Sequence, residues 1–237
     1  RLNSVKAEIS RSARDGELTM SNENVRTLAL NVLERIEKDH SYSNLLLQQT
    51  IKKHELHPKD VALLTEIVYG TIQRKKTLDY YLAPFLPKKI KPRDQWMLSL
   101  LRMSLYQMVY LDRIPDRAIV FEAVQIAKKR GHRGLASIVN GILRNVQRKG
   151  LRSVKKISDE WERLAVHYSH PKWLLKRWSE QYGIEAAKAI CEANLRSPLV
   201  KARVNTSKRS VEEVIDLLKR DHILARPGKM ADEAIEI

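Results

Sequence analysis

Apolar residues recur with helical spacing through the first 150 residues of the chain. From Val25 to Ile36 they follow an i, i+3, i+4, i+7 pattern, and Asn22 is of a residue type that caps helix N-termini. The same periodicity predicts further helices over residues 41–53, 57–70, 96–111, 118–129 and 135–148, and one more around Leu78 and Leu82. Because strand-like alternation is absent before about residue 198, we expect residues 21–150 to form one all-helical domain.

One predicted helix has no polar face. The segment Trp96–Leu111 reads WMLSLLRMSLYQMVYL and is apolar on almost every side. A helix of this kind must be surrounded by other helices. We therefore place it at the centre of the helical domain.

The pattern changes after Gly150. Residues 151–168 alternate basic and aromatic positions and are expected to form a linker, after which helices are predicted over 173–182 and 184–194. The sequence continues with LVKARVN (199–205) as a strand, VEEVIDLLKR (211–220) as a helix, and ILARP and AIEI as strands. The expected fold class is mainly α, with the helical domain followed by a small, incomplete α+β domain over 169–237.

Both ends of the chain lie outside this pattern. Residues 1–20 have mixed charge and weak periodicity, and we expect a disordered or non-native extension there. At the other end the last strand pattern runs up to Ile237. An α/β unit that stopped at this point would leave an unpaired strand edge, so we expect the natural polypeptide to continue.

A cationic stretch stands out within the helical domain. Between Lys128 and Lys156 the chain has ten Lys or Arg residues and no Asp or Glu. On a helical wheel one arc is apolar and holds Leu135, Ile138, Val139, Ile142, Leu143 and Val146. The opposite arc holds Arg133, Ser137, Asn140, Arg144, Gln147 and Arg148. The pattern predicts a helix that packs on one side and offers charge to a polyanion on the other, although a merely solvated basic surface is the alternative.

The whole-chain composition favours the polyanion. The 44 basic residues exceed the 28 acidic ones and give a formal charge of +16, which is typical of nucleic-acid-binding domains. A membrane role is disfavoured because no apolar run approaches the ~20 residues of a spanning helix. The start of the chain lacks the apolar core of a signal peptide, and the single cysteine, Cys191, excludes an internal disulfide. We therefore expect a cytoplasmic protein, with Cys191 as a small core residue.

Five blocks of the sequence resemble one enzyme family. They read SYSNLLLQ (41–48), LLTEIVYGTIQ (63–73), SLLRMSLYQMVYLDRIPDRAIVFEAVQIAKKRGHRGLASIVNGILRNVQR (99–148), SHPKWLLKRW (169–178) and RVN (203–205). In order, spacing and wording they resemble the N-terminal region of bacterial 16S rRNA cytosine-C5 methyltransferases of the RsmB (Sun) type. The resemblance implies a NusB-like helical domain, then a ferredoxin-like domain, and in the family a catalytic domain that binds S-adenosylmethionine.

The catalytic part of that family is missing from this sequence. No Gly-rich segment like DACAAPGGK is present, and the family's two catalytic cysteines cannot be assigned to Cys191. We therefore expect no catalytic, cofactor-binding or metal-binding residue in this chain. S-adenosylmethionine is implied only for the full-length parent protein.

The resemblance implies that RNA recognition is what this chain retains. Its expected partner is 16S ribosomal RNA, with no membrane contact and with other proteins as further partners of the NusB-like domain. The candidate RNA-binding residues are Lys128, Lys129, Arg130, Arg133, Asn140, Arg144, Arg148 and Arg203. Arg and Lys suit phosphates, and Asn140 suits a base edge or a 2′-hydroxyl.

Structural roles compete with these assignments. Asn140 can instead bond to a neighbouring helix, Arg144 can pair with Glu122 or Asp116, and Arg203 can be structural. A second basic cluster, with solvated loops as its alternative, surrounds Tyr80 and Tyr81. It consists of Arg74, Lys75, Lys76, Lys88, Lys89, Lys91 and Arg93.

A possible metal site and an alternative function also have to be considered. In the SHPKWLLKRW block, His167 and His170 lack Cys or acidic residues at ligand spacing, so we expect Trp173 and Trp178 to pack the second domain instead of a metal site. The alternative function is a stand-alone NusB-like module that binds RNA or protein in transcription antitermination. The blocks after residue 160 favour the methyltransferase, because a free-standing NusB-like factor is expected to end near residue 150.

Overall fold

The computed structural model describes residues 24–39, 41–91, 94–196 and 200–237, which it divides into two compact units, Arg1–Trp178 and Ser179–Ile237. The predicted N-cap Asn22 and the extension over residues 1–20 lie outside the described residues.

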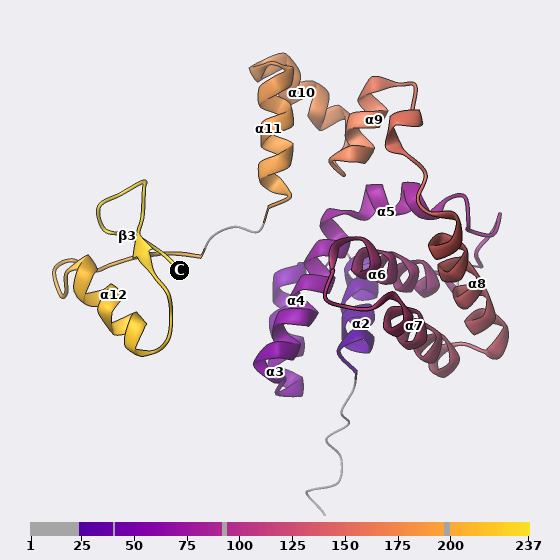
Figure 1. Cartoon of the computed structure of the whole chain (residues 1–237), viewed down its shortest axis with the longest axis horizontal. Helices are drawn as coiled ribbons and strands as arrows, with labels where there is room; N and C mark the ends of the chain where they lie inside the picture. The colour runs from indigo at the N-terminus through magenta and orange to yellow at the C-terminus, as the bar shows by residue number, and fades with distance from the viewer. Residues whose placement is uncertain (1–23, 40, 92–93, 197–199) are drawn as a thin grey trace, which may run out of the picture. The chain divides into compact units, whose positions relative to one another are not determined.

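Seven helices follow one another through the described part of residues 24–150, as the periodicity predicts (Figure 1). They are α2 (Val25–Asp39), α3 (Ser43–His54), α4 (Pro58–Gln73), α5 (Lys75–Leu82), α6 (Trp96–Tyr110), α7 (Asp116–Arg130) and α8 (Arg133–Lys149). Pro58 starts α4, where its missing N–H is not needed and its fixed φ suits the first turn. None of the helices in the described part of the chain combines the length and apolar character that a membrane span requires.

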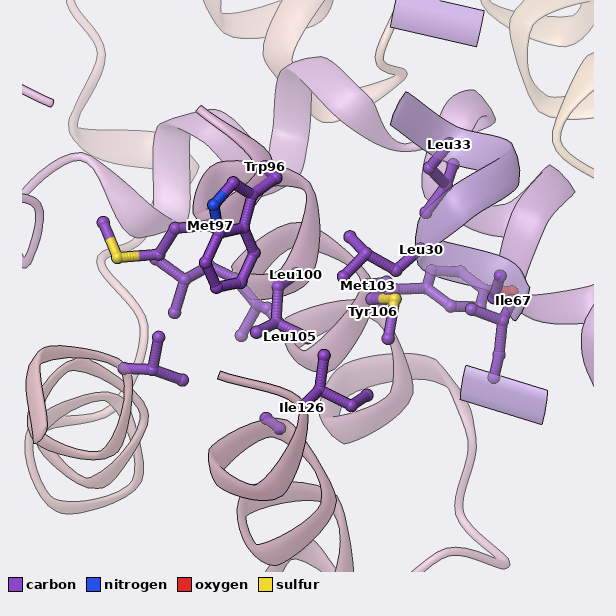
Figure 2. Packing of buried hydrophobic residues seen from close by; sticks show 14 of the residues in the cluster. Leu30, Leu33, Ile67, Trp96, Met97, Leu100, Met103, Leu105, Tyr106 and Ile126 are labelled. Carbon is purple, nitrogen blue, oxygen red and sulfur yellow. The ribbon is translucent and has the colours of Figure 1, made fainter. Parts of the chain in front are cut away.

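Helix α6 lies at the centre of this unit, as its apolar sequence predicts. It contacts α2, α4, α5, α7 and α8. Figure 2 shows side chains from four helices meeting there, among them Leu30 of α2, Ile67 of α4, Leu100 of α6 and Ile126 of α7. These residues are buried, and their removal from water is the main source of stability for the helical unit.

Arg102 and Gln107 of α6 are also buried, and both find partners. Arg102 donates two hydrogen bonds to the Asp79 carboxylate, at 2.6 and 2.9 Å. Gln107 accepts a hydrogen bond from Arg26 Nε at 2.8 Å and donates one to the Met103 carbonyl at 2.9 Å. Buried polar groups cost stability unless they are paired in this way, so these contacts fix how the helices pack around α6.

The segment expected to be a linker is ordered and packed. It contains the 3₁₀ helix η2 (Val154–Lys156) and helix α9 (Glu160–His167), which Asp159 caps by accepting a hydrogen bond from the Glu162 amide at 2.8 Å. Thr77 Oγ1 of α5 donates to the Val166 carbonyl at 2.5 Å, and Ser169 Oγ accepts from the Lys76 amide at 3.1 Å. These contacts hold α9 against α5, which sequence reasoning did not predict because the partner helix lies about 90 residues away.

The second unit has the predicted α+β character. Helix α10 (Lys172–Tyr182) crosses the boundary between the units, and α11 (Ile184–Asn194) follows. The remaining elements are β1 (Lys201–Arg203), α12 (Val211–Arg220), β2 (Arg226–Pro227) and β3 (Ala234–Glu236). The strands form an antiparallel sheet in the order β1-β3-β2, and Val211 of α12 packs with Val204 and Ile235 of the sheet.

One expectation about the tryptophans is wrong. Trp173 is 64% exposed, so it does not pack a core in this structure. Trp178 is half-buried, and its ring lies 5.7 Å from that of His170. The helix pattern around Trp173 did not separate a buried position from an exposed one, because α10 buries only Leu175 fully.

Candidate nucleic-acid interface

Helices α7 and α8 form an antiparallel hairpin with a two-residue connection, Gly131 and His132. The two helices contact each other, and Gln147 near the end of α8 bonds to Asp116 at the start of α7. The inner face of α8 is the predicted apolar arc, with Leu135, Val139 and Ile142 among its buried residues. The hairpin thus turns the opposite arc of α8 to solvent.

The predicted polar arc of α8 is exposed, with Gln147 half-buried at its edge. One position of the apolar arc differs from expectation, because Ile138 is 42% exposed. Ile138 lies at the margin of the arc. Helical periodicity alone defines the centre of a buried stripe better than its edges.

Half of the six candidate cations on the hairpin, Lys128, Lys129 and Arg133, are exposed and have no side-chain partner among the described residues. Lys128 and Lys129 end α7, and Arg133 begins α8. Neither their charged groups nor the amide of Asn140 makes a side-chain hydrogen bond or ion pair with another described residue. We call the set Lys128, Lys129, Arg133, Asn140, Arg144 and Arg148 the hairpin face.

Arg144 and Arg148 make weak local contacts on this face. Arg144 Nη1 donates to Gln147 Oε1 at 3.3 Å, and Gln147 Nε2 donates to Asp116 Oδ2 at 3.3 Å. Arg148 Nη2 donates to Asn145 Oδ1 at 2.7 Å. Arg144 therefore reaches Asp116 only through an amide, and neither arginine is neutralised by a carboxylate.

A shallow hollow lies between these two arginines. Arg144, Arg148 and Gly141 line it, together with Asn145 and Gln147. A Cβ atom added at Gly141 would have no atom within 4 Å, so the space above this glycine is open. The helix backbone is accessible here to an approaching ligand, with a guanidinium on either side.

Arg130 is exposed but paired with other residues of the protein. It forms an ion pair with Glu34 of α2, donates to Asn31 Oδ1 at 2.9 Å, and lies 5.5 Å from the centre of the Trp96 ring. Burial raises the pKa of the Glu34 carboxyl, although Arg130 opposes that shift. The structure thus gives Arg130 a structural task that its neighbours Lys128 and Lys129 do not have.

Half of the described members of the second basic cluster have a partner within the protein. Lys75 Nζ lies 2.5 Å from Glu37 and Lys76 Nζ lies 3.0 Å from Glu162, while the Arg74 guanidinium lies 4.6 Å from the centre of the Tyr110 ring. Three others, Lys88, Lys89 and Lys91, are exposed and make no ion pair with a described residue. Arg93 lies outside the described residues. We call the described members of this second basic cluster the α5 cluster. They are Arg74, Lys75, Lys76, Lys88, Lys89 and Lys91.

Arg203 belongs to the second unit. It lies on β1 with its side chain exposed, beside an open hollow that Asn205 and Ser207 also line. Asn205 Oδ1 accepts from Ser207 Oγ at 2.6 Å and from the Ser207 amide at 3.3 Å, which fixes the turn after the strand. Asn205 therefore has a structural role, and Arg203 extends from a defined edge of the sheet.

Sequence reasoning missed Phe121. It lies on α7, is 58% exposed and stands outside the hydrophobic core. A signal was present, because Phe121 falls on the outer arc of the same helical pattern whose inner arc contains Ile119, Val120 and Ala123. An aromatic residue on the outer arc of an amphipathic helix marks a position worth testing for contact with a partner.

The described residues do not fit the cofactor of the family. The family's cofactor loop follows a parallel strand, whereas every strand pair in the described part of the chain is antiparallel. Cys191 is buried in α11, and burial, with the charge of Glu192, raises the pKa of its thiol. A thiol of this kind is a poor nucleophile. His170 Nδ1 contacts the Tyr168 carbonyl at 2.6 Å, and no group of metal ligands occurs among the described residues.

Comparison with known proteins agrees with this architecture. The NusB family matches residues 23–148, and the ferredoxin-like domain of RsmF/B-like methyltransferases matches residues 170–237. The chain is 48% identical to the probable ribosomal RNA small subunit methyltransferase B of Bacillus subtilis (strain 168), over 92% of this chain and 48% of that protein. It is 32% identical to the protein of the same name from Synechocystis sp., over 81% of this chain and 43% of that protein.

The chain thus spans about half the length of the curated relatives it matches. The crystal structure of PH0851 has the same fold, with a TM-score of 0.63 and 20% identity over 92% of this chain and 49% of that chain. Both domains match known families, in the order expected from the sequence. The chain belongs to the NusB family, and its C-terminal residues carry an RsmF/B-like ferredoxin-like domain.

Proposed function

We propose that this chain is the RNA-recognition part of an S-adenosylmethionine-dependent methyltransferase that modifies cytosine C5 in 16S ribosomal RNA. The hairpin face carries the proposal, because its cations are exposed and Lys128, Lys129 and Arg133 have no partner among the described residues. Desolvated and paired cations cannot release counterions from RNA, whereas exposed unpaired ones can. The names of the relatives supply the substrate class.

The residues of the face have different tasks in this proposal. Arg144, Arg148 and the lysines neutralise phosphates, and Asn140 reads a base edge or a 2′-hydroxyl. Arg203 adds a phosphate contact from the second unit. Residues 21–150 act as the RNA-binding domain, and the chain recognises RNA without performing chemistry. A ribosomal RNA partner would place the protein in the cytoplasm.

The second candidate is a NusB-like module of transcription antitermination that binds RNA and partner proteins. The match of residues 170–237 to an RsmF/B-like ferredoxin-like domain supports the methyltransferase instead, because it extends the likeness beyond the helical domain. Binding of other proteins by the helical domain remains part of the methyltransferase proposal. The methyltransferase and the antitermination module differ in the RNA that each would bind.

The test is the affinity of the whole chain for a small-subunit rRNA hairpin and for a scrambled hairpin, measured by fluorescence anisotropy across a salt series. We expect preferential, salt-sensitive binding to the rRNA hairpin. The double variant Arg144→Ala/Arg148→Ala is expected to lower the salt slope by up to about two, since each phosphate contact contributes ~0.7 to 0.9. Equal binding to both hairpins would leave only a non-specific basic surface.

A charge-matched control is available on α3. Lys52 and Lys53 are exposed in its last turn, and Lys52→Ala/Lys53→Ala removes the same two charges from a different place. We expect this variant to retain the wild-type salt slope. If both double variants lose affinity equally, net charge and not the hairpin face determines binding.

A further inference from the structure

Phe121 is one of the exposed aromatic residues of the first unit, together with Tyr42 and Trp173. The chain has two phenylalanines, and the other, Phe85, packs against the hydrophobic core. Phe121 is 58% exposed and takes no part in that core. Most of the phenyl ring is in water, where it gains nothing for folding, so the ring is accessible to a ligand.

The position of Phe121 along the hairpin follows from a printed contact. Asp116, at the start of α7, accepts a hydrogen bond from Gln147 of α8. Phe121 lies five residues after Asp116, which is about 7.5 Å along the helix axis. Helix α8 runs antiparallel to α7. The same distance, measured back along α8 from Gln147, therefore ends between Asn140 and Arg144. Phe121 therefore stands level with the middle of the hairpin face.

Two cations and an amide lie on the side of α7 that carries Phe121. Arg117 lies four residues before it, Gln125 four after and Lys128 seven after, so all three share its side of α7. Arg117 and Lys128 are exposed and make no ion pair with a described residue. An aromatic ring between cations suits a nucleobase attached to phosphates, whereas a protein-binding hot spot needs apolar neighbours around its aromatic anchor.

We propose that Phe121 is a stacking platform for an unpaired base of the bound RNA. The base lies on the phenyl ring while Lys128 and Arg144 contact the phosphates on either side of it. The ligand class is single-stranded or looped RNA, because bases in a duplex are already stacked and cannot reach a protein ring. This inference rests on the proposed function and deepens it, since it assigns a base contact to a face otherwise defined by charge.

The test uses the whole chain with Phe121→Ala, Phe121→Leu and Phe121→Trp. Stacking on an aromatic ring contributes enough that its loss lowers affinity for a looped RNA by about fivefold to a hundredfold. We expect Phe121→Ala and Phe121→Leu to show this loss, and Phe121→Trp to retain affinity. The salt slope stays at the wild-type value in all three, because no phosphate contact is removed.

A second readout reports on the stack itself. With 2-aminopurine in the loop of the RNA, wild-type protein and Phe121→Trp are expected to quench its fluorescence, and Phe121→Leu is not. Tyr42→Ala is the control, because Tyr42, the N-cap residue of α3, is 77% exposed, and α3 contacts α2 and α4. Circular dichroism checks that each variant is folded.

Three outcomes would overturn the inference. Wild-type affinity in Phe121→Ala, or in Phe121→Leu, means that no ring stacks at this position. If Arg144→Ala/Arg148→Ala weakens binding while Phe121→Ala does not, the stacking platform fails and the proposed function stands. If the wild-type chain binds no RNA at low salt, both fail.

Discussion

The hairpin face and the α5 cluster carry similar charge but differ in what their side chains contact. In the α5 cluster, Lys75 and Lys76 meet carboxylates of α2 and α9, and Arg74 lies over a tyrosine ring. On the hairpin face, Lys128 and Arg133 meet only solvent within the described part of the chain. A count of basic residues therefore does not identify a binding surface, because cations already paired within the protein hold helices together.

The largest effect on stability is expected from replacing Arg102, which lies next to the α5 cluster. Arg102 is almost buried, pairs with Asp79 at 2.6 Å, and lies 3.5 Å from the Glu37 carboxylate that also binds Lys75. Arg102→Ala removes the charge-assisted hydrogen bonds of a buried guanidinium to these partly exposed carboxylates, so we expect it to lower the free energy of unfolding by about 2 to 3 kcal/mol. Chemical denaturation measures this. A loss below about 1 kcal/mol would mean that the network adds little to stability.

Two glycine substitutions are expected to have opposite effects on stability. Gly70 lies in α4 one turn before Arg74, and a Cβ atom there would overlap the Tyr106 ring. Gly70→Ala is therefore expected to destabilise the fold by about 1 to 3 kcal/mol. Gly141→Ala on the hairpin face meets open space and removes backbone freedom from the unfolded chain, so a gain of about 0.5 to 1 kcal/mol is expected.

Thermal unfolding of Gly70→Ala and Gly141→Ala measures these two changes in stability. Exposed helical glycine costs stability, and no contact within the described protein explains why α8 retains one at Gly141. Destabilisation by Gly141→Ala would show that the glycine has an internal role after all.

The lysines of the α5 cluster are expected to matter less than those of the hairpin face. Lys75 and Lys76 are partly exposed, so replacing either by Ala is expected to cost up to about 1 kcal/mol of stability, after screening by solvent. Their loss is expected to change RNA affinity no more than the α3 control does. A fall in the salt slope as large as that of Arg144→Ala/Arg148→Ala would place the α5 cluster in the RNA interface.

In the second unit, the buried carboxylate of Glu236 pairs with two exposed cations, Lys201 and Arg226. This differs from both basic surfaces of the helical unit. Burial by itself raises the pKa of Glu236, but hydrogen bonds from Arg226 and Lys201 outweigh it and lower the pKa below its ordinary value of 4.5. A lowered folded-state pKa gives stability that is present above 4.5 and is lost as the pH falls through the folded value.

We therefore expect the sheet to loosen in acid, and Glu236→Gln to remove most of that pH dependence. Amide hydrogen exchange of β1 and β3, measured across the acid range, checks this. A variant with the same pH profile as the wild type would show that other carboxylates cause the loosening.

Much of the architecture could be predicted from periodicity. The α8 stripe of Leu135, Val139 and Ile142 alternates with polar positions at 3.6-residue spacing, and this alone predicts both a helix and its buried side. The apolar α6 likewise predicts its own central place. The strands after residue 200 were predicted by composition, but their order β1-β3-β2 was not, because pairing depends on residues far apart in the chain.

The candidate site could be predicted only in part. Lys128 and Arg130 look alike in the sequence, yet Arg130 is two residues further round α7 and faces Glu34 and Trp96 of other helices. Phe121 was overlooked because a single apolar residue among cations has no pattern of its own. Local spacing shows which side of a helix is outward, but not which outward residue another element covers.

The sequence by itself determined that α8 has an apolar and a cationic side, that α6 is central, and that an α+β unit follows the helices. These properties are local, since they depend on neighbours three and four residues away. The tertiary structure alone decided that α9 packs on α5, that Arg130 and Lys75 are paired, and that Lys128, Arg133 and Phe121 are left exposed. Those outcomes depend on contacts between distant segments, and such contacts exist only once the chain has folded.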